Sequence, residues 1–169
     1  FDLERLFVKD GVKVLHLSGL IAALSEKTSA LCLALARKAK ENGTLVSFDL
    51  NYRASFWVNR EKELRAAFTE IASLSDILVG NEEDFQLALG IEGPEAGGKD
   101  LLEKTDAFRG MIDRVRTVFP NASVFATTLR EVESANSHLW GAVMLYGDEF
   151  YTAPARRIEV LDRIGGGDG

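Results

Sequence analysis

The glycine-rich stretch Gly165 to Asp168 is the part of this 169-residue sequence best suited to chemistry. Glycine has no Cβ, so three adjacent glycines (Gly165, Gly166 and Gly167) reach backbone angles at which several amide N–H groups converge on one anionic oxygen. Asp168 would then place a candidate base beside that oxygen. The alternative is a flexible glycine turn, and the residues upstream have to decide between the two.

A second group of candidates, Asn51-Tyr52-Arg53, directly follows a predicted strand at 44–50. The planar guanidinium of Arg53 can bind two oxygens of a carboxylate or phosphate at once, although a surface arginine that caps a loop is an equal alternative. Tyr52 is either part of the same site or an aromatic residue at the edge of the core. Asp49 either reaches the same crevice or caps the turn after the strand.

Asn81-Glu82-Glu83-Asp84 begins a predicted helix and carries three carboxylates. The helix dipole stabilises negative charge at this position without any function. If the helix start faces a crevice, Asn81 and Asp84 can instead help to hold a hydrated Mg²⁺, which prefers a few carboxylates and retained waters.

Two other patterns are weaker indications of a functional site. Arg130 follows a predicted strand and either clamps a phosphate or pairs with Glu131 or Glu133. Residues Gly93 to Asp100 nearly match a Walker-type phosphate loop, but Asp100 stands where that loop needs Ser or Thr, and no strand leads into it. We interpret that segment as a surface connection.

The elements that must position these residues alternate along the chain. Strands are expected at 11–18, 44–50, 77–79 and 123–128, helices at 25–42, 64–74, 82–89 and 108–118, and a hairpin at 140–146 and 149–152. This pattern predicts an α/β fold: a doubly wound, mainly parallel sheet with helices on both faces and an antiparallel addition near the end. Ligands of such sheets bind beyond the carboxyl ends of the strands, where the candidates fall.

Composition limits the class of protein. The sequence is 46% hydrophobic and has a formal net charge of -6 with scattered basic residues, which argues against a nucleic-acid or anionic-membrane surface. Cys32 is the only cysteine, so no disulfide framework is expected and a cytoplasmic location fits best. No apolar run is long enough to span a membrane. His16 and His138 have no partners at metal-ligand spacing and receive no role.

Five stretches of this sequence, in this order, resemble the ribokinase-like (phosphofructokinase B-type) carbohydrate kinases, and within them the 2-dehydro-3-deoxygluconate kinases. They are HLSG at 16–19, FDLNYRASFW at 48–57, GNEEDF at 80–85, ATTLREVESAN at 126–136 and DRIGGGD at 162–168. The resemblance implies a single kinase domain of which residues 1–169 are the central part. The amino-terminal sugar segment with its lid strands and the carboxyl-terminal elements of the adenine pocket are then expected outside it.

The resemblance also implies roles for the candidate residues. Asp168 would be the base that takes the proton of a terminal hydroxyl, and Gly165 to Gly167 the anion hole for the transferring phosphoryl group. Tyr52 and Arg53, with Arg130, would bind a sugar acid. Asn81 and Asp84 would organise Mg²⁺ and the phosphates of ATP.

Two departures from the family pattern stand out. Asp84 replaces the usual glutamate and is one methylene shorter, so Glu82 or Glu83 is expected to share its task. Arg163 and Ile164 replace threonines of the wider family, so the sequence does not predict a monovalent-cation site near Asp162.

The expected function is ATP-dependent phosphorylation of 2-dehydro-3-deoxy-D-gluconate. A fructokinase-type sugar kinase and a non-catalytic binding module are the alternatives. The expected partners are the sugar acid and ATP, with no nucleic acid or membrane, and the resemblance favours a homo-oligomer.

Overall fold

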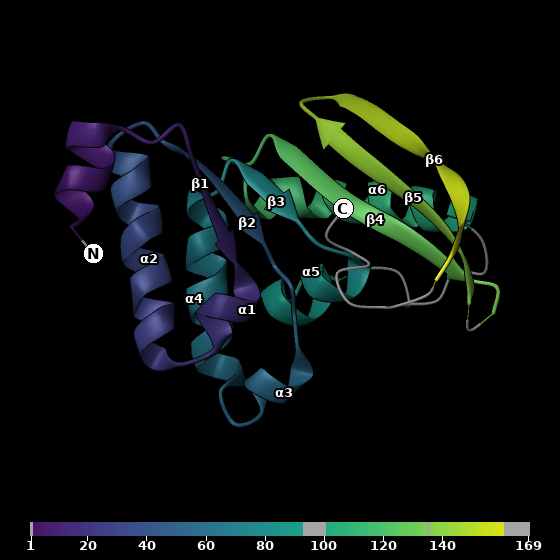
Figure 1. Cartoon of the computed structure of the whole chain (residues 1–169), viewed down its shortest axis with the longest axis horizontal. Coiled ribbons are helices and arrows are strands. Elements are labelled where there is room, and N and C mark those ends of the chain that lie inside the picture. The colour runs from purple at the N-terminus through teal and green to yellow at the C-terminus, as the bar shows by residue number, and fades with distance from the viewer. Residues whose placement is uncertain (1, 93–100, 135, 161–169) are drawn as a thin grey trace.

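The alternating elements form one sheet in the computed structural model, which describes residues 2–92, 101–134 and 136–160 (Figure 1). The six strands are β1 (Val14–Ser18), β2 (Leu45–Asp49), β3 (Ile77–Val79), β4 (Val124–Val132), β5 (Ser137–Tyr146) and β6 (Glu149–Glu159). They lie in chain order across the sheet. Strands β1 to β4 are parallel, whereas β4, β5 and β6 pair antiparallel.

Helices connect the parallel strands. They are α1 (Gly19–Ala23), α2 (Glu26–Glu41), α3 (Ala54–Trp57), α4 (Glu61–Leu74), α5 (Glu82–Leu89) and α6 (Leu101–Val118), preceded by a short π-helical segment η1 (Arg5–Asp10). Helices α2 and α4 lie side by side along the first strands, and α6 runs behind β4 (Figure 1). The predicted α/β fold class is confirmed: the sheet is mixed, with four parallel strands followed by two antiparallel ones, and helices pack against it.

Local sequence signals fix the ends of two helices near the strand ends. The Ser25 hydroxyl accepts the Thr28 N–H at 3.2 Å and the Thr28 hydroxyl accepts the Ser25 N–H at 3.0 Å, which caps α2 reciprocally. Asn81 and Asp84 cap α5 in the same way. Gly90 ends α5 with a φ of 71°, a left-handed conformation that glycine adopts without strain.

The core lies between the sheet and the helices that connect its parallel strands. Its largest fully buried side chains include Phe48 of β2, Phe68 of α4, Phe85 of α5, Phe108 of α6 and Phe125 of β4. The ring of Phe48 contacts that of Phe68 edge to face at a centroid distance of 5.3 Å. This packing anchors β2 to α4, and the candidate site lies just beyond the end of β2.

The structure departs from the sequence prediction in short elements and in the lengths of several others, since α6 begins at Leu101 instead of 108, β5 begins at Ser137 instead of 140, and β6 continues to Glu159 instead of 152. Helices α1 and α3 and the segment η1 are too short to show a clear hydrophobic period. Strand β4 continues to Val132, so Arg130 lies within a strand instead of after one. The extension exists because β5 pairs with β4 along its whole length, a tertiary contact that the local sequence does not report.

Within the described part of the chain, no helix is long and apolar enough to cross a membrane.

Candidate active site

Two of the predicted groups meet where β2 and β3 end. The Tyr52 N–H donates to Oδ1 of Asp84 at 2.9 Å, although the two residues are 32 positions apart. The Asn81 N–H donates to Oδ2 of the same carboxylate at 2.9 Å, and the Asp84 N–H donates to Oδ1 of Asn81 at 2.8 Å. The loop after β2 and the first turn of α5 therefore form one hydrogen-bonded unit at the carboxyl edge of the sheet.

The loop after β2 turns sharply to reach this position. The Leu50 N–H still donates to the Val79 carbonyl at 2.8 Å, and Asn51 then adopts a φ of 38°. Asparagine tolerates this left-handed region better than most residues. The ring of the half-buried Tyr52 packs against buried Trp57 at a centroid distance of 5.1 Å. The turn thus directs the chain outward while Tyr52 stays anchored to the core.

Arg53 is exposed and begins helix α3. Its Nη1 donates to the Tyr52 carbonyl at 2.7 Å, which holds one side of the guanidinium against the loop. Its charge acts on the carboxylates of Asp49 and Asp84 and favours their ionised forms. A guanidinium at this point is available to an anionic group that enters from solvent.

Asp49 and Asp84 form a pair of partly shielded carboxylates beside this loop. Burial raises the pKa of Asp49, and the nearby charge of Asp84 raises it further, while the Asn51 N–H, His16 and Arg53 lower it. Burial also raises the pKa of Asp84, against the lowering effect of the Asn81 and Tyr52 N–H groups. The site thus concentrates negative charge in a confined space, next to one exposed cation.

Two glycines that sequence reasoning did not assign make this arrangement possible. A Cβ on Gly80 would lie 3.1 Å from Cβ of Asp84. A Cβ on Gly19 would overlap the carbonyl oxygen of Leu50 and lie 2.7 Å from the Phe68 ring. The available signal was their position, since each glycine directly follows a strand and lies at or just before the start of a helix.

Arg130 lies apart from the hydrogen-bonded unit. Strand β3 ends in register with Ala126 of β4, so Arg130 stands in the part of β4 that extends past β3. Its side chain is exposed, and its guanidinium carbon lies 5.7 Å from the ring centroid of Trp140 on β5. The described structure therefore brings Tyr52, Arg53, Asn81 and Asp84 together and places Arg130 on a neighbouring strand.

Comparison with known proteins shows which family the chain belongs to. The sequence profile of the pfkB family of carbohydrate kinases matches residues 9–131. The chain belongs to this family. The resemblance to ribokinase-like carbohydrate kinases that the sequence motifs indicated is thereby confirmed.

Individual relatives are named for keto-deoxy sugar acids. A 5-dehydro-2-deoxygluconokinase from Clostridium perfringens is 36% identical over 103 residues, which are 61% of this chain and 30% of that protein. A 2-dehydro-3-deoxygluconokinase from Thermotoga maritima has a TM-score of 0.84 and 28% identity over 99% of this chain and 47% of its own. A proposed ribokinase II from E. coli, solved with ATP and Mg²⁺, has a TM-score of 0.63 over 95% of this chain and 43% of its own; at 20% identity it shows the fold alone. The chain spans less than half the length of each of these proteins.

Several predicted residues of the family site lie outside the described residues. They are Gly165, Gly166, Gly167 and Asp168, and the Gly93 to Asp100 segment also falls outside them. Within the described ranges, no group of three or more His, Cys, Asp or Glu residues is arranged to hold a metal ion. The start of α5 nevertheless offers carboxylates, because Glu82 is only half-buried and Glu83 is exposed.

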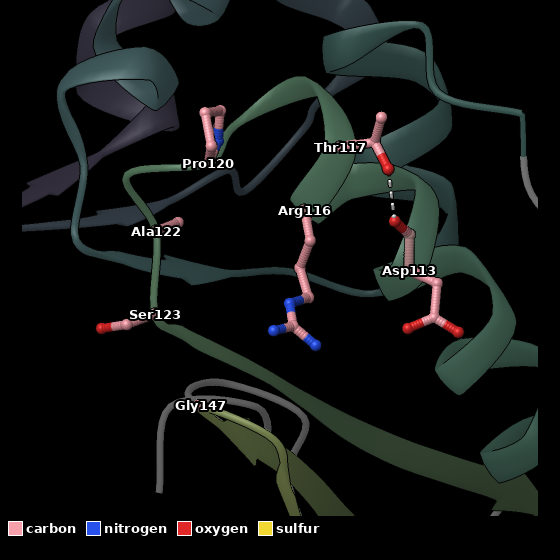
Figure 2. Close-up of a pocket in the computed structure, with 7 residues that line it drawn as sticks. All are labelled: Asp113, Arg116, Thr117, Pro120, Ala122, Ser123 and Gly147. Atoms are coloured by element: carbon pink, nitrogen blue, oxygen red, sulfur yellow. Dashed lines mark hydrogen bonds between the residues drawn. The ribbon is translucent and has the colours of Figure 1, made fainter.

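A separate hollow of about 520 Å³ lies at the opposite edge of the sheet, where α6 ends and β4 begins (Figure 2). It is lined by Asp113, Arg116, Thr117, Pro120, Ala122, Ser123 and Gly147. Two of its polar groups have partners in the protein, since Thr117 donates to the Asp113 carbonyl and Arg116 pairs with Asp148 at 2.8 Å. Because ligands of parallel sheets bind at the carboxyl ends of strands, this amino-terminal edge is not the candidate site.

Proposed function

We propose that the protein containing this chain is an ATP-dependent kinase that phosphorylates the primary hydroxyl of 2-dehydro-3-deoxy-D-gluconate to give the 6-phosphate. The observation that carries the proposal is the meeting of the Tyr52-Arg53 loop with the first turn of α5 at the carboxyl edge of the sheet. Membership of a carbohydrate kinase family and relatives named for keto-deoxy sugar acids support the same conclusion.

In this proposal Arg53 binds the carboxylate of the substrate, and Tyr52 forms one wall of the sugar pocket. The exposed guanidinium suits a carboxylate because its two N–H groups match the two oxygens. Arg130 supplies a second positive charge from β4. A neutral sugar would lose the contact to Arg53, so this residue selects sugar acids.

Asp168 is proposed as the base, and Gly165, Gly166 and Gly167 as donors to the migrating phosphoryl group. Phosphoryl transfer passes through a loose transition state with charge spread over the equatorial oxygens, so positioned N–H donors matter more than a strong base. The base has only to accept the proton of the sugar hydroxyl as the new O–P bond forms. An aspartate with an ordinary pKa suffices for that step.

The first turn of α5 is proposed to face the nucleotide phosphates and Mg²⁺. Asn81 and Asp84 define this turn, and the accessible carboxylates of Glu82 and Glu83 fit a hydrated Mg²⁺ that keeps most of its waters. When bound, the ion would neutralise part of the charge of the nucleotide phosphates. The E. coli protein of the same fold, solved with ATP and Mg²⁺, supports this choice of cofactor.

A second substrate has specific support. The Clostridium perfringens relative at 36% identity is named for 5-dehydro-2-deoxygluconate. Both compounds are six-carbon sugar acids that differ in the positions of the keto and deoxy groups, so Arg53 would serve either one. The chemistry of a carboxylate contact alone does not choose between them.

Release of ADP by the full-length protein tests these proposals across a panel of both keto-deoxy sugar acids, gluconate and fructose. Arg53→Ala is expected to raise KM for sugar acids by about 10- to 100-fold, the range for loss of a charge-assisted hydrogen bond, and to leave fructose turnover nearly unchanged. Asp168→Asn is expected to lower kcat by about 100-fold or more. Equal losses for acids and neutral sugars in Arg53→Ala would refute the carboxylate contact, and a fully active Asp168→Asn would refute the base.

We also propose that the protein acts in the cytoplasm as a homo-oligomer on small molecules alone. Its acidic net charge of -6 supports the absence of a nucleic-acid partner. Light scattering of the purified full-length protein measures the oligomeric state, and a monomer at all concentrations would contradict that part.

A further inference from the structure

The Asp84 carboxylate links two backbone segments that belong to different strand ends. Oδ2 accepts the N–H of Asn81, three residues away, as part of the α5 cap. Oδ1 accepts the N–H of Tyr52, which lies 32 residues away in the loop after β2. The first hydrogen bond is local, whereas the second is a tertiary contact that a helix cap does not require. The side chain therefore does more than start a helix.

The surroundings of Asp84 suit a structural link inside the protein. The residue is only 7% exposed, and the absence of a side chain at Gly80 leaves the space that it fills. A Cβ on Gly80 would lie 3.1 Å from Cβ of Asp84 and 3.2 Å from Cδ1 of Leu50. Both carboxylate oxygens accept backbone N–H groups, while Glu82 and Glu83 in the same turn are less buried.

We propose that Asp84 is a positioning residue, whose carboxylate holds the Tyr52-Arg53 loop against the first turn of α5. The inference rests on the proposed function, because the loop affects catalysis only if Tyr52 and Arg53 bind the sugar acid. The aspartate then couples the sugar side of the site to its phosphate side. In this proposal Mg²⁺ contacts Glu82 or Glu83, which are more accessible than Asp84.

Hydrogen exchange of the full-length protein without ligands tests the link itself. The Tyr52 and Asn81 amides are expected to exchange slowly in the wild type, although Tyr52 is only half-buried. Asp84→Asn is expected to accelerate exchange about tenfold at Tyr52, Asn81 or both, because an amide offers one acceptor oxygen in place of two. Fast exchange of the Tyr52 amide in the wild type would overturn the proposal without any variant.

Asp76→Asn is the matched control. Oδ2 of Asp76 also accepts a backbone N–H, from Val46 at 2.8 Å, but this carboxylate lies at the amino-terminal edge of the sheet, and Oδ1 contacts Lys40. This variant is expected to accelerate exchange at Val46 and to leave Tyr52 unchanged. Acceleration at Tyr52 in Asp76→Asn would mean that general loosening, and not the link, controls the loop.

Steady-state kinetics separates positioning from metal binding. Asp84→Asn is expected to raise KM for the sugar acid about tenfold while the Mg²⁺ concentration for half-maximal activity changes less than about twofold. Asp84→Glu is not expected to rescue KM, because the extra methylene moves the carboxylate away from both N–H groups. Gly80→Ala should raise KM in the same way by displacing Asp84, and Asp76→Asn should leave KM unchanged.

Other results would contradict the inference or the proposed function. A change confined to the Mg²⁺ requirement, or wild-type kinetics in Asp84→Glu, would assign Asp84 to the metal and overturn the inference. If the wild-type protein phosphorylates no sugar acid, the proposed function fails, and the exchange experiment still decides whether the link exists.

Discussion

At the scale of single residues, the candidate site is a compact group of charges in which burial competes with hydrogen bonding. Asp49 and Asp84 repel each other, and burial raises the pKa of each carboxyl. Arg53 partly offsets this repulsion from the solvent side. Such an arrangement stores unfavourable energy in the free protein that a bound cation or a rearranged proton can relieve.

A stability measurement can detect the free-energy cost of ionising Asp49 in the folded protein. Because the folded pKa of this carboxyl lies above its unfolded value, ionisation destabilises the fold as the pH rises through the two values. Asp49→Asn removes the ionisation, and its amide oxygen can still accept the Asn51 N–H. The variant is therefore expected to be more stable than the wild type at pH 7.

Urea unfolding of both proteins over a series of pH values provides the test. The advantage of Asp49→Asn should shrink as the pH falls and disappear below about pH 4, near the ordinary aspartate pKa. A difference in free energy of unfolding that stays constant between pH 4 and pH 7 would contradict the raised pKa.

At the scale of elements, the close approach of α1 to the end of β2 sets the geometry of the carboxyl edge. Gly19 is buried at the first position of α1 and allows contact with the Leu50 backbone. The hydroxyl of Ser18 also accepts a hydrogen bond from Nδ2 of Asn51 at 3.4 Å, which joins β1 to the loop that carries Tyr52. The site therefore depends on contacts among three strand ends.

Gly19→Ala is expected to destabilise the protein by about 3 kcal/mol or more, because its Cβ would overlap the Leu50 carbonyl and neither backbone can yield easily. Gly110→Ala is the matched control. Gly110 lies inside α6, and nothing beyond the adjacent residues and backbone of that helix lies within 4 Å of the position that a Cβ would take there, so alanine should stabilise by about 1 kcal/mol through helix propensity. Thermal and urea unfolding measure both changes, and a neutral Gly19→Ala would refute the close approach.

At the scale of the whole molecule, one face of the sheet keeps apolar side chains exposed. Alternate residues of a strand point to opposite faces, and the strand register places Val14, Leu45, Met144 and Tyr146 on the same face. Their exposed fractions are 48%, 48%, 37% and 57%. The other face carries Val46, Phe48 and Phe125, all fully buried in the core. The hydrophobic surface of this chain is therefore strongly one-sided.

The double substitution Leu45→Thr and Met144→Thr is expected to reduce binding of a hydrophobic dye such as ANS to the chain of residues 1–169 by roughly half, since it removes two of the large side chains on this face. Stability should change by less than about 0.5 kcal/mol per site, because the residues are exposed and threonine suits strands. Unchanged dye fluorescence would show that this face does not present the apolar patch.

Periodicity and end signals in the sequence were sufficient to predict the main elements. Buried positions recur at helical spacing in α4, although that helix begins at Glu61 and not at 64. Asn81 and Gly90 mark the two ends of α5, so local rules reach the correct boundaries of that helix. The same rules could not find the full length of β4, because its second half is a strand only through pairing with β5. The very short α1 and α3 depend in the same way on what they pack against.

The sequence by itself determined the class of fold and the order in which candidate residues follow the strands, because hydrophobic period and capping residues act over a few positions. Only the tertiary structure decided which of those residues meet. The contact of Asp84 with Tyr52 joins positions 32 residues apart, and the space beside Gly80 and Gly19 exists only when three strand ends pack together. Such contacts depend on the simultaneous placement of several elements, and no local pattern of residues encodes that placement.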